Sequence, residues 1–231
     1  MTVRERSIGL TGLSDFWKKH YFDEYIAAGG SKVKFVSGKP GSGKTRLLAL
    51  LKETAEAAGY QTVCFSAKDI LLSDFKEVYL AALDQSDPGR IVQGCARTVI
   101  SQMGYDPQVC AESGQFIDYL AQEGLNDPIS RREIREQLRS TFLTNPYLDN
   151  NFALAFSLLT GDALGYPRLE DAARDTLLAF LHADKSVKLS ALRAEGLSPT
   201  RITKINARHM LRSLGEVIHL SGQKGLLVLV D

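Results

Sequence analysis

The feature that most constrains this chain is a glycine-rich stretch near its N-terminal end. It reads Gly38-Lys39-Pro40-Gly41-Ser42-Gly43-Lys44-Thr45 and matches G-x-x-x-x-G-K-[ST] at every defined position. Gly41 and Gly43 have no Cβ, so the backbone can curl and turn its N–H groups inward. Together with the positive end of a following helix, these N–H groups form a nest for a chain of phosphates. The motif therefore predicts a phosphate-binding loop.

The residues on either side have the pattern that such a loop requires. Residues 33–36 (Val-Lys-Phe-Val) predict a short strand that leads in, and the leucines from Leu47 onward begin a helical pattern that continues through Ala57. Lys44 would then reach the β- and γ-phosphates, and the Thr45 hydroxyl would bind Mg²⁺. The alternative is a chance loop with no ligand, which the strand–loop–helix context disfavours.

A second matching element lies at the other end of the chain. Residues 225–231 read Gly-Leu-Leu-Val-Leu-Val-Asp, and a continuous apolar run of this length predicts a strand buried on both faces. Ligands of open parallel sheets bind outside the carboxyl ends of the strands. We therefore predict that Asp231 is the Walker B carboxylate, which holds Mg²⁺ opposite Thr45. An ordinary core strand that ends in aspartate is the alternative.

The pattern between these two elements predicts the domain organisation. Residues 60–66 predict a second strand, which gives a β–α–β unit with a right-handed crossover and a parallel sheet. From residue 69 to 222, one helical pattern follows another with Pro and Gly between them, and the last is a long helix over 201–221 with Ile205 on its apolar face. The predicted fold class is α/β, with a P-loop core at 1–68, a helical insertion at 69–222 and the Walker B strand at 223–231.

Charge, cysteine spacing and hydropathy argue against several classes of protein. The net charge of +1 gives no global electrostatic case for nucleic acid or an anionic membrane. The three cysteines (Cys64, Cys95 and Cys110) form no C-x-x-C pair, which disfavours a metal site or a disulfide framework. No apolar run approaches the length of a membrane span, and the first residues have no signal-peptide core. We expect a cytoplasmic protein.

Three weaker features leave alternatives open. The basic groups at 131–139 and 193–212 could follow the phosphates of DNA, but a solvated helix face with i, i+4 ion pairs is favoured, since no aromatic residues are interleaved. The four histidines show no metal spacing. Residues 14–26 predict a lead-in helix with Ser14 as its N-cap. Before it, Ile8, Gly9 and Leu10 are candidates for contact with adenine.

The position of Asp231 leads to an expectation about activity. In many ATP-hydrolysing P-loop proteins, a glutamate that activates water directly follows this aspartate. A polar sensor and an arginine finger come from further elements. None of these can lie within the sequence given. We therefore expect an N-terminal portion of a longer protein, which binds nucleotide with little turnover and in which Lys44 and Asp231 are the catalytic residues present.

The chain also resembles a known family, the ATP-binding proteins of bacterial BREX phage-defence systems, and in particular their BrxD type. The resemblance is carried by residues 38–45, by residues 205–214 (Ile-Asn-Ala-Arg-His-Met-Leu-Arg-Ser-Leu) and by residues 225–231. It implies a P-loop ATPase related to the AAA+ and origin-recognition groups, with ATP or ADP and Mg²⁺ as cofactors. As partners it implies DNA, other proteins of the defence system and copies of the same chain, but no membrane.

Two other function classes remain open from the sequence. A small-molecule or nucleotide kinase also uses a P-loop, but such enzymes do not usually place a Walker B strand so late in the chain. A non-enzymatic scaffold would use the helical region to bind protein or DNA and keep the nucleotide as a structural element. Phosphotransfer assays and salt-dependent DNA titrations separate these classes from an ATPase.

Overall fold

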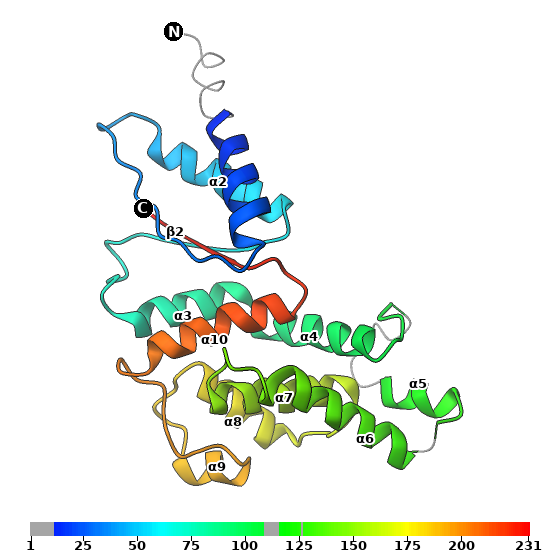
Figure 1. The fold of residues 1–231 in the computed structure, drawn as a ribbon. Coiled ribbons are helices and arrows are strands. Elements are labelled where there is room, and N and C mark those ends of the chain that lie inside the picture. The colour runs from blue at the N-terminus through cyan, green and yellow to red at the C-terminus, as the bar shows by residue number, and fades with distance from the viewer. Residues whose placement is uncertain (1–11, 109–115, 126) are drawn as a thin grey trace. The chain divides into compact units, whose positions relative to one another are not determined.

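Within the described residues, the sheet has two strands that lie far apart in the sequence. In a computed structural model of the chain, β1 (Gln61–Phe65) pairs in parallel with β2 (Leu226–Val230). The strands predicted at residues 60–66 and 225–231 are therefore confirmed, and so is their parallel pairing. The structure describes residues 12–108, 116–125 and 127–231 (Figure 1).

The chain divides into two units, each of which is described by itself. The first unit takes in Met1–Ile70 and Gln223–Asp231 and contains the sheet, and the second is Leu71–Gly222. Throughout the part of the second unit that the structure describes, the regular elements are helices, with no strand among them.

The core of the first unit lies between its helices and the sheet. Helix α2 (Lys44–Ala57) buries Leu47, Leu51 and Ala55, which recur every four residues along one face. The other helical segment begins at residue 12 and continues as a π-helix, η1 (Lys18–Ile26), which buries Phe22. Tyr60 joins the two segments, because its ring packs on Phe22 and its hydroxyl donates to the Phe22 carbonyl oxygen at 2.5 Å.

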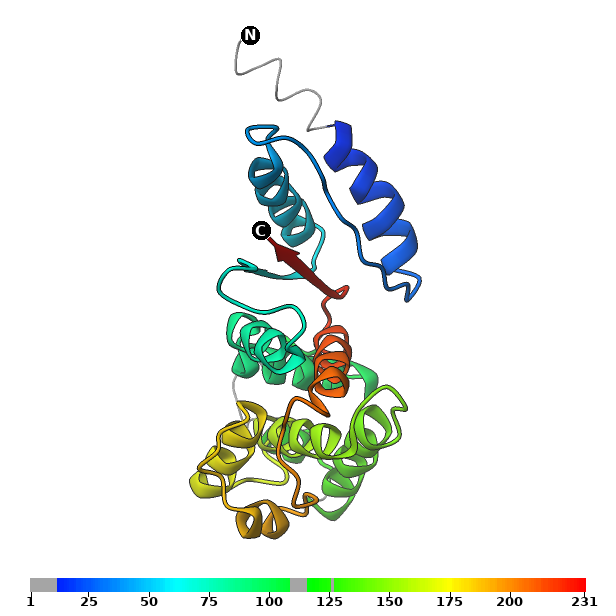
Figure 2. The same cartoon turned by 90° about the vertical axis from the view of Figure 1, so that its left-hand side faces the viewer.

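The second unit is built from helices that pack around a shared apolar core. In chain order they are α3 (Phe75–Ser86), α4 (Pro88–Gln102), α5 (Phe116–Gln122), α6 (Asp127–Leu138), the π-helix η2 (Arg139–Leu143), α7 (Asn150–Leu164), α8 (Asp171–Leu181), α9 (Leu189–Ala194) and α10 (Ala207–Leu220). Helices α3 and α10 lie side by side (Figures 1 and 2). Helix α7, the most apolar, is buried over most of its length.

Helix starts show where local sequence signals hold and where packing overrides them. Asp87 caps α4 by accepting from the Gly89 and Arg90 N–H groups, and Pro88 follows it, as the Asp-Pro pair predicts. The prediction that Ser14 is an N-cap is wrong. Ser14 lies inside the helix, where it is buried and forms a hydrogen bond with Thr54 Oγ1 at 2.8 Å.

The predicted strand at residues 33–36 is also wrong. The described part of the sheet has two strands, and this segment pairs with neither of them. Instead, the Lys32 and Lys34 ammonium groups lie 5.9 and 4.8 Å from the centre of the Tyr21 ring. The side chains that would face a core are open to solvent: Val33 is 77% exposed and Phe35 is 92% exposed. A strand needs a neighbour for its backbone hydrogen bonds, and an apolar pattern by itself does not supply one.

The long helix predicted over 201–221 is shorter than expected. Helix α10 begins at Ala207, because the Asn206 side chain accepts from the Thr203 N–H group and donates to the Arg201 carbonyl oxygen. These bonds hold residues 201–206 in a turn that competes with helix formation. Ile205 therefore lies outside the helix and is 92% exposed, not on its apolar face.

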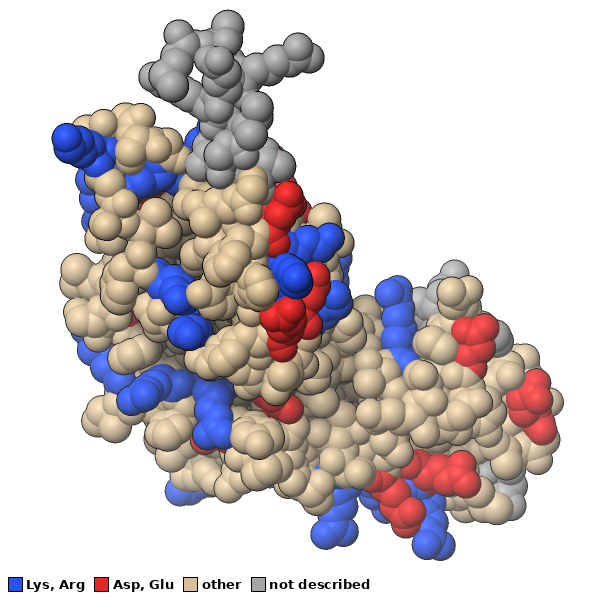
Figure 3. All heavy atoms as spheres, turned by 45° about the horizontal axis from the view of Figure 1, so that its top comes forward, with Lys and Arg blue, Asp and Glu red and all other residues tan. Residues whose placement is uncertain are grey.

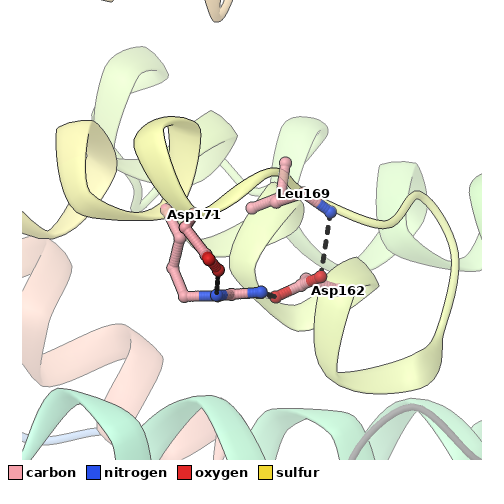
Figure 4. Close-up of polar contacts among 4 residues, drawn as sticks. Asp162, Leu169 and Asp171 are labelled. Atoms are coloured by element: carbon pink, nitrogen blue, oxygen red, sulfur yellow. Dashed lines mark hydrogen bonds and ion pairs between the residues drawn. The ribbon is translucent and has the colours of Figure 1, made fainter.

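Asp162 links the end of α7 to the start of α8 (Figure 4). One carboxylate oxygen accepts from the Leu169 N–H group at 2.9 Å, and the other accepts from Arg174 Nε and Nη2 at 2.9 and 2.8 Å. Asp171 binds the same guanidinium through Nη1 at 2.7 Å, yet its own side chain is 94% exposed, against 17% for Asp162. The two aspartates thus share a partner but differ in burial.

We expect Asp162→Ala to lower the free energy of unfolding by about 2 kcal/mol, because it removes charge-assisted hydrogen bonds from a shielded site. Asp171→Ala is the matched control, and we expect it to cost less than about 0.5 kcal/mol, as for an exposed ion pair. Urea unfolding followed by circular dichroism measures both values. Equal losses in the two variants would contradict this account of α7 and α8.

Asp74 connects the starts of α3 and α10. It accepts from the Lys76 N–H group at 3.1 Å as the N-cap of α3, and it forms an ion pair with Lys204. The Lys204 hydrogen bond, with help from the backbone bonds, holds the pKa of the Asp74 carboxyl below its ordinary value of 3.8. A carboxyl whose pKa is lower in the folded state contributes stability that is present above the unfolded pKa and lost as the pH falls.

We therefore expect the stability difference between the wild type and Asp74→Asn to be largest above the ordinary pKa of 3.8 and to shrink as the pH falls below it. Urea unfolding of both proteins across this pH range measures the difference. A difference that stays constant as the pH falls would show that the Asp74 charge plays no part in linking the two helices.

Candidate functional site

The glycine-rich loop (residues 38–45) lies in the first unit and leads directly into α2. Gly41 and Gly43 have φ angles of 78° and 88°, in the left-handed region that glycine adopts without a steric penalty. Gly43 occupies the N-cap position of α2, so the helix begins at Lys44. Because Leu47 and Leu51 anchor this helix in the core, the exposed loop is presented from a fixed base.

Lys44 folds back over the loop. Its ammonium group donates to the Gly38 carbonyl oxygen at 2.9 Å and to the Lys39 carbonyl oxygen at 3.2 Å. Among the described residues it forms no ion pair with a carboxylate. Within the described segments, the partners of this positive charge are two carbonyl dipoles. The charge also lies at the start of a helix, where the helix dipole favours an anion. An ammonium group in this setting can exchange carbonyl oxygens for phosphate oxygens.

Thr45 and Asp231 lie next to each other although 186 positions separate them in the sequence. The Thr45 hydroxyl donates to Asp231 Oδ2 at a distance of 3.5 Å. Asp231 follows β2, and its backbone is tied to the end of β1 by bonds from Asp231 N–H to the Phe65 carbonyl and from Ala67 N–H to the Asp231 carbonyl. The parallel register of the sheet therefore positions this carboxylate beside the start of α2.

A hydroxyl and a carboxylate are the kind of oxygen donors that Mg²⁺ accepts, with waters and phosphate oxygens completing its shell. The pair of Thr45 and Asp231 fits such an ion. No cluster of three or more histidine, cysteine or acidic side chains suited to a metal is found in residues 12–108, 116–125 and 127–231. The Thr45 and Asp231 oxygens would suit an ion that takes its remaining ligands from phosphate and water.

Burial shifts the pKa values of two other titratable groups of the first unit, Cys64 and Tyr60. Burial raises the pKa of the Cys64 thiol, which favours its neutral form over the nucleophilic thiolate. Burial likewise raises the pKa of Tyr60, whose hydroxyl is already used in the core. The candidates for adenine contact (Ile8, Gly9 and Leu10), like Cys110, lie outside the described residues.

The arginines of α6 and α10 pair with carboxylates, with aromatic rings or with both. On α6, Arg131 pairs with Asp127 at 2.8 Å and Arg132 with Glu136 at 2.9 Å, which is the i, i+4 pairing of a solvated face. The guanidinium carbons of Arg131 and Arg135 also lie 5.1 and 5.7 Å from the centre of the Tyr166 ring. On α10, Arg208 lies over the Phe75 ring and Arg212 over the Tyr147 ring. On the face drawn in Figure 3, lysine and arginine side chains form separate groups divided by uncharged surface.

Two features, one in each unit, could not be found from the sequence. One is the pair of hydrogen bonds that Lys44 donates to the Gly38 and Lys39 carbonyl oxygens, because the motif specifies residue types and not hydrogen-bond acceptors. The other is the pairing of the α10 arginines with aromatic rings. Those rings come from α3 and from the turn before α7, so a search for aromatic residues between the arginines cannot detect them.

None of the helices in the described segments is long and apolar enough to cross a membrane.

Comparison with known proteins gives the family of the chain. No curated protein matches the chain, and no solved structure does. The model of one protein family, described as BREX system ATP-binding protein BrxC/D, matches residues 18–231. This match spans both units and both ends of the candidate site, and the chain therefore belongs to the BREX system ATP-binding protein BrxC/D family.

Proposed function

We propose that this chain binds Mg·ATP at the glycine-rich loop and serves as an AAA+-like ATPase module in bacterial phage defence. The family supports ATP binding in phage defence. The observation that carries the site assignment is the 3.5 Å contact between Thr45 Oγ1 and Asp231 Oδ2. It joins the end of the predicted phosphate loop to the predicted metal carboxylate, which is the arrangement that a nucleotide-bound Mg²⁺ requires.

Each residue of the proposed site has a separate task. The backbone N–H groups of residues 38–45 and the start of α2 surround the phosphates. The Lys44 ammonium group releases the Gly38 and Lys39 carbonyl oxygens and takes up phosphate oxygens. Thr45 and Asp231 would hold Mg²⁺, and the ion would supply positive charge to the phosphates. Lys44 and Asp231 are in this way the proposed catalytic residues.

The coupling of the nucleotide to a partner is also part of the proposal. Helix α10 leads into β2, whose carboxyl end carries Asp231, so the helical unit and the metal carboxylate belong to one continuous stretch of chain. We propose that nucleotide binding at this carboxylate is transmitted along that stretch to a protein or DNA partner of the helical unit. Measurement of phosphate release from ATP tests hydrolysis by this protein. The Lys44→Ala variant serves as the inactive reference.

We expect Lys44→Ala to weaken binding of Mg·ATP by at least about tenfold, since the loss of one charge-assisted contact to phosphate costs about 1.5–3 kcal/mol. Lys52→Ala is the matched control, because Lys52 lies on the same helix and is half exposed in an ion pair with Glu56. Isothermal titration calorimetry measures both affinities. Unchanged binding in Lys44→Ala, or equal loss in both variants, would defeat the assignment of the loop.

We expect Thr45→Ala and Asp231→Asn to reduce the gain in ATP affinity that Mg²⁺ provides by about three- to tenfold, because each removes a ligand from the ion. Thr45→Ser keeps the hydroxyl and should keep the gain. ATP titrations in the presence of Mg²⁺ and of excess chelator give, for each protein, the ratio of the two ATP affinities. If Thr45→Ala retained the full Mg²⁺ effect while Thr45→Ser lost it, the metal role of this hydroxyl would be refuted.

A further inference from the structure

An exposed apolar patch lies where α3 and α10 begin. Leu71 is 62% exposed, Leu72 50%, Phe75 40% and Ile205 92%. The ion pair of Asp74 with Lys204 holds these two helix starts together, and Ile205 directly follows Lys204. The patch therefore has a defined position on the helical unit.

Two arginines extend this patch along α10. Arg208 and Arg212 are one helical turn apart and so lie on the same face of the helix. The Arg208 guanidinium carbon lies 6.0 Å from the centre of the Phe75 ring, and that of Arg212 lies 5.0 Å from the centre of the Tyr147 ring. Neither arginine forms an ion pair within the described part of the chain. Cation–π attraction to these rings favours the observed positions of both guanidinium groups.

The surface is also hollowed at its far end. Tyr147, which is 54% exposed, and Glu216, which follows Arg212 by one turn, belong to the lining of a hollow of about 410 Å³. The remaining lining is mostly amide and hydroxyl groups, such as those of Asn145 and Thr141. The exposed aliphatic side chains thus lie at the starts of α3 and α10, the two arginines lie on α10, and Glu216 of the same helix lines the hollow.

The chemistry of this surface favours a protein over a nucleic acid. Aliphatic side chains such as Leu72 and Ile205 gain nothing from phosphates, and two unpaired arginines fall short of the roughly 6–10 phosphate contacts typical of a DNA-binding face. Carboxylates one turn apart on a partner helix match the spacing of Arg208 and Arg212, about 6 Å along the axis.

We propose that the α3–α10 surface, formed by Leu71, Leu72, Phe75, Ile205, Arg208 and Arg212, docks an acidic amphipathic helix of a partner protein. The carboxylates of that helix pair with Arg208 and Arg212, and its apolar side chains cover the patch around Phe75 and Ile205. Charge complementarity sets the register, and burial of the exposed aliphatic groups supplies the affinity. This inference goes beyond the proposed nucleotide site and does not depend on it.

The test uses the whole chain and a synthetic helical peptide with leucines along one face and glutamates one turn apart beside them. Fluorescence anisotropy of the labelled peptide measures affinity. We expect R208E/R212E to weaken binding by at least about tenfold, and a peptide with glutamine in place of glutamate to bind the wild type more weakly by a similar factor. A peptide with lysine in place of glutamate should bind the R208E/R212E protein better than the wild type.

Matched controls separate this site from other effects. K185E/K188E makes the same change of net charge at two exposed lysines of the helical unit and should leave affinity unchanged. Lys44→Ala should also bind the peptide normally, so a failure of the nucleotide site and a failure of this surface are distinguishable. Circular dichroism checks that each variant is folded.

Three outcomes would overturn the proposal. One is the absence of peptide binding by the wild type. Another is equal affinity for the glutamate and glutamine peptides. The third is binding of duplex DNA that R208E/R212E abolishes while peptide binding persists, which would assign the arginines to nucleic acid instead.

Discussion

The parallel pairing of β1 with β2 is the contact on which the candidate site depends. These strands come from positions that most of the chain separates, and a parallel ladder is the arrangement that brings both carboxyl ends to the same edge of the sheet. Helix α2 starts at that edge and is fixed to the sheet by Leu47 and Leu51. The register of the strand pair determines which way the Asp231 side chain points, because a strand shifted by one residue would turn Asp231 away from Thr45.

The helical unit is stabilised by contacts of its own. Tyr79 illustrates this, because it is fully buried and its hydroxyl donates to the Leu181 carbonyl oxygen at 2.6 Å, which joins α3 to α8. Burial raises the pKa of that hydroxyl well above its ordinary value, so it remains a donor at any physiological pH. A unit with its own core can act as a rigid body, and a rigid body is what a nucleotide-dependent movement would need to act on a partner.

The two proposals meet in one segment of the chain. Helix α10 carries Arg208 and Arg212 on its exposed side, and the strand that follows it ends at Asp231. A partner that binds the α3–α10 surface would therefore hold the same segment whose end contacts the proposed Mg²⁺. Two ligands that favour one arrangement of a segment stabilise each other's binding by the same factor. If both proposals hold, partner and nucleotide would each change the affinity of the chain for the other.

The sequence by itself determined the elements whose signals are local. The glycine-rich loop, the strands at 60–66 and 225–231 and the Asp87 cap all depend on neighbours within a few residues. Such patterns act through backbone geometry and through the period of a helix or strand. The family resemblance rested on the same local signals and is confirmed by the match over residues 18–231.

Only the tertiary structure decided the contacts that depend on distant partners. Residues 33–36 have the apolar content of a strand, but no neighbouring strand pairs with them, and Ile205 has helical spacing but precedes a helix that the Asn206 turn delays. The approach of Thr45 to Asp231 and the stacking of Arg212 on Tyr147 likewise join segments far apart in the chain. A sequence pattern records what a residue prefers, whereas the folded chain determines which other residues are close enough to satisfy that preference.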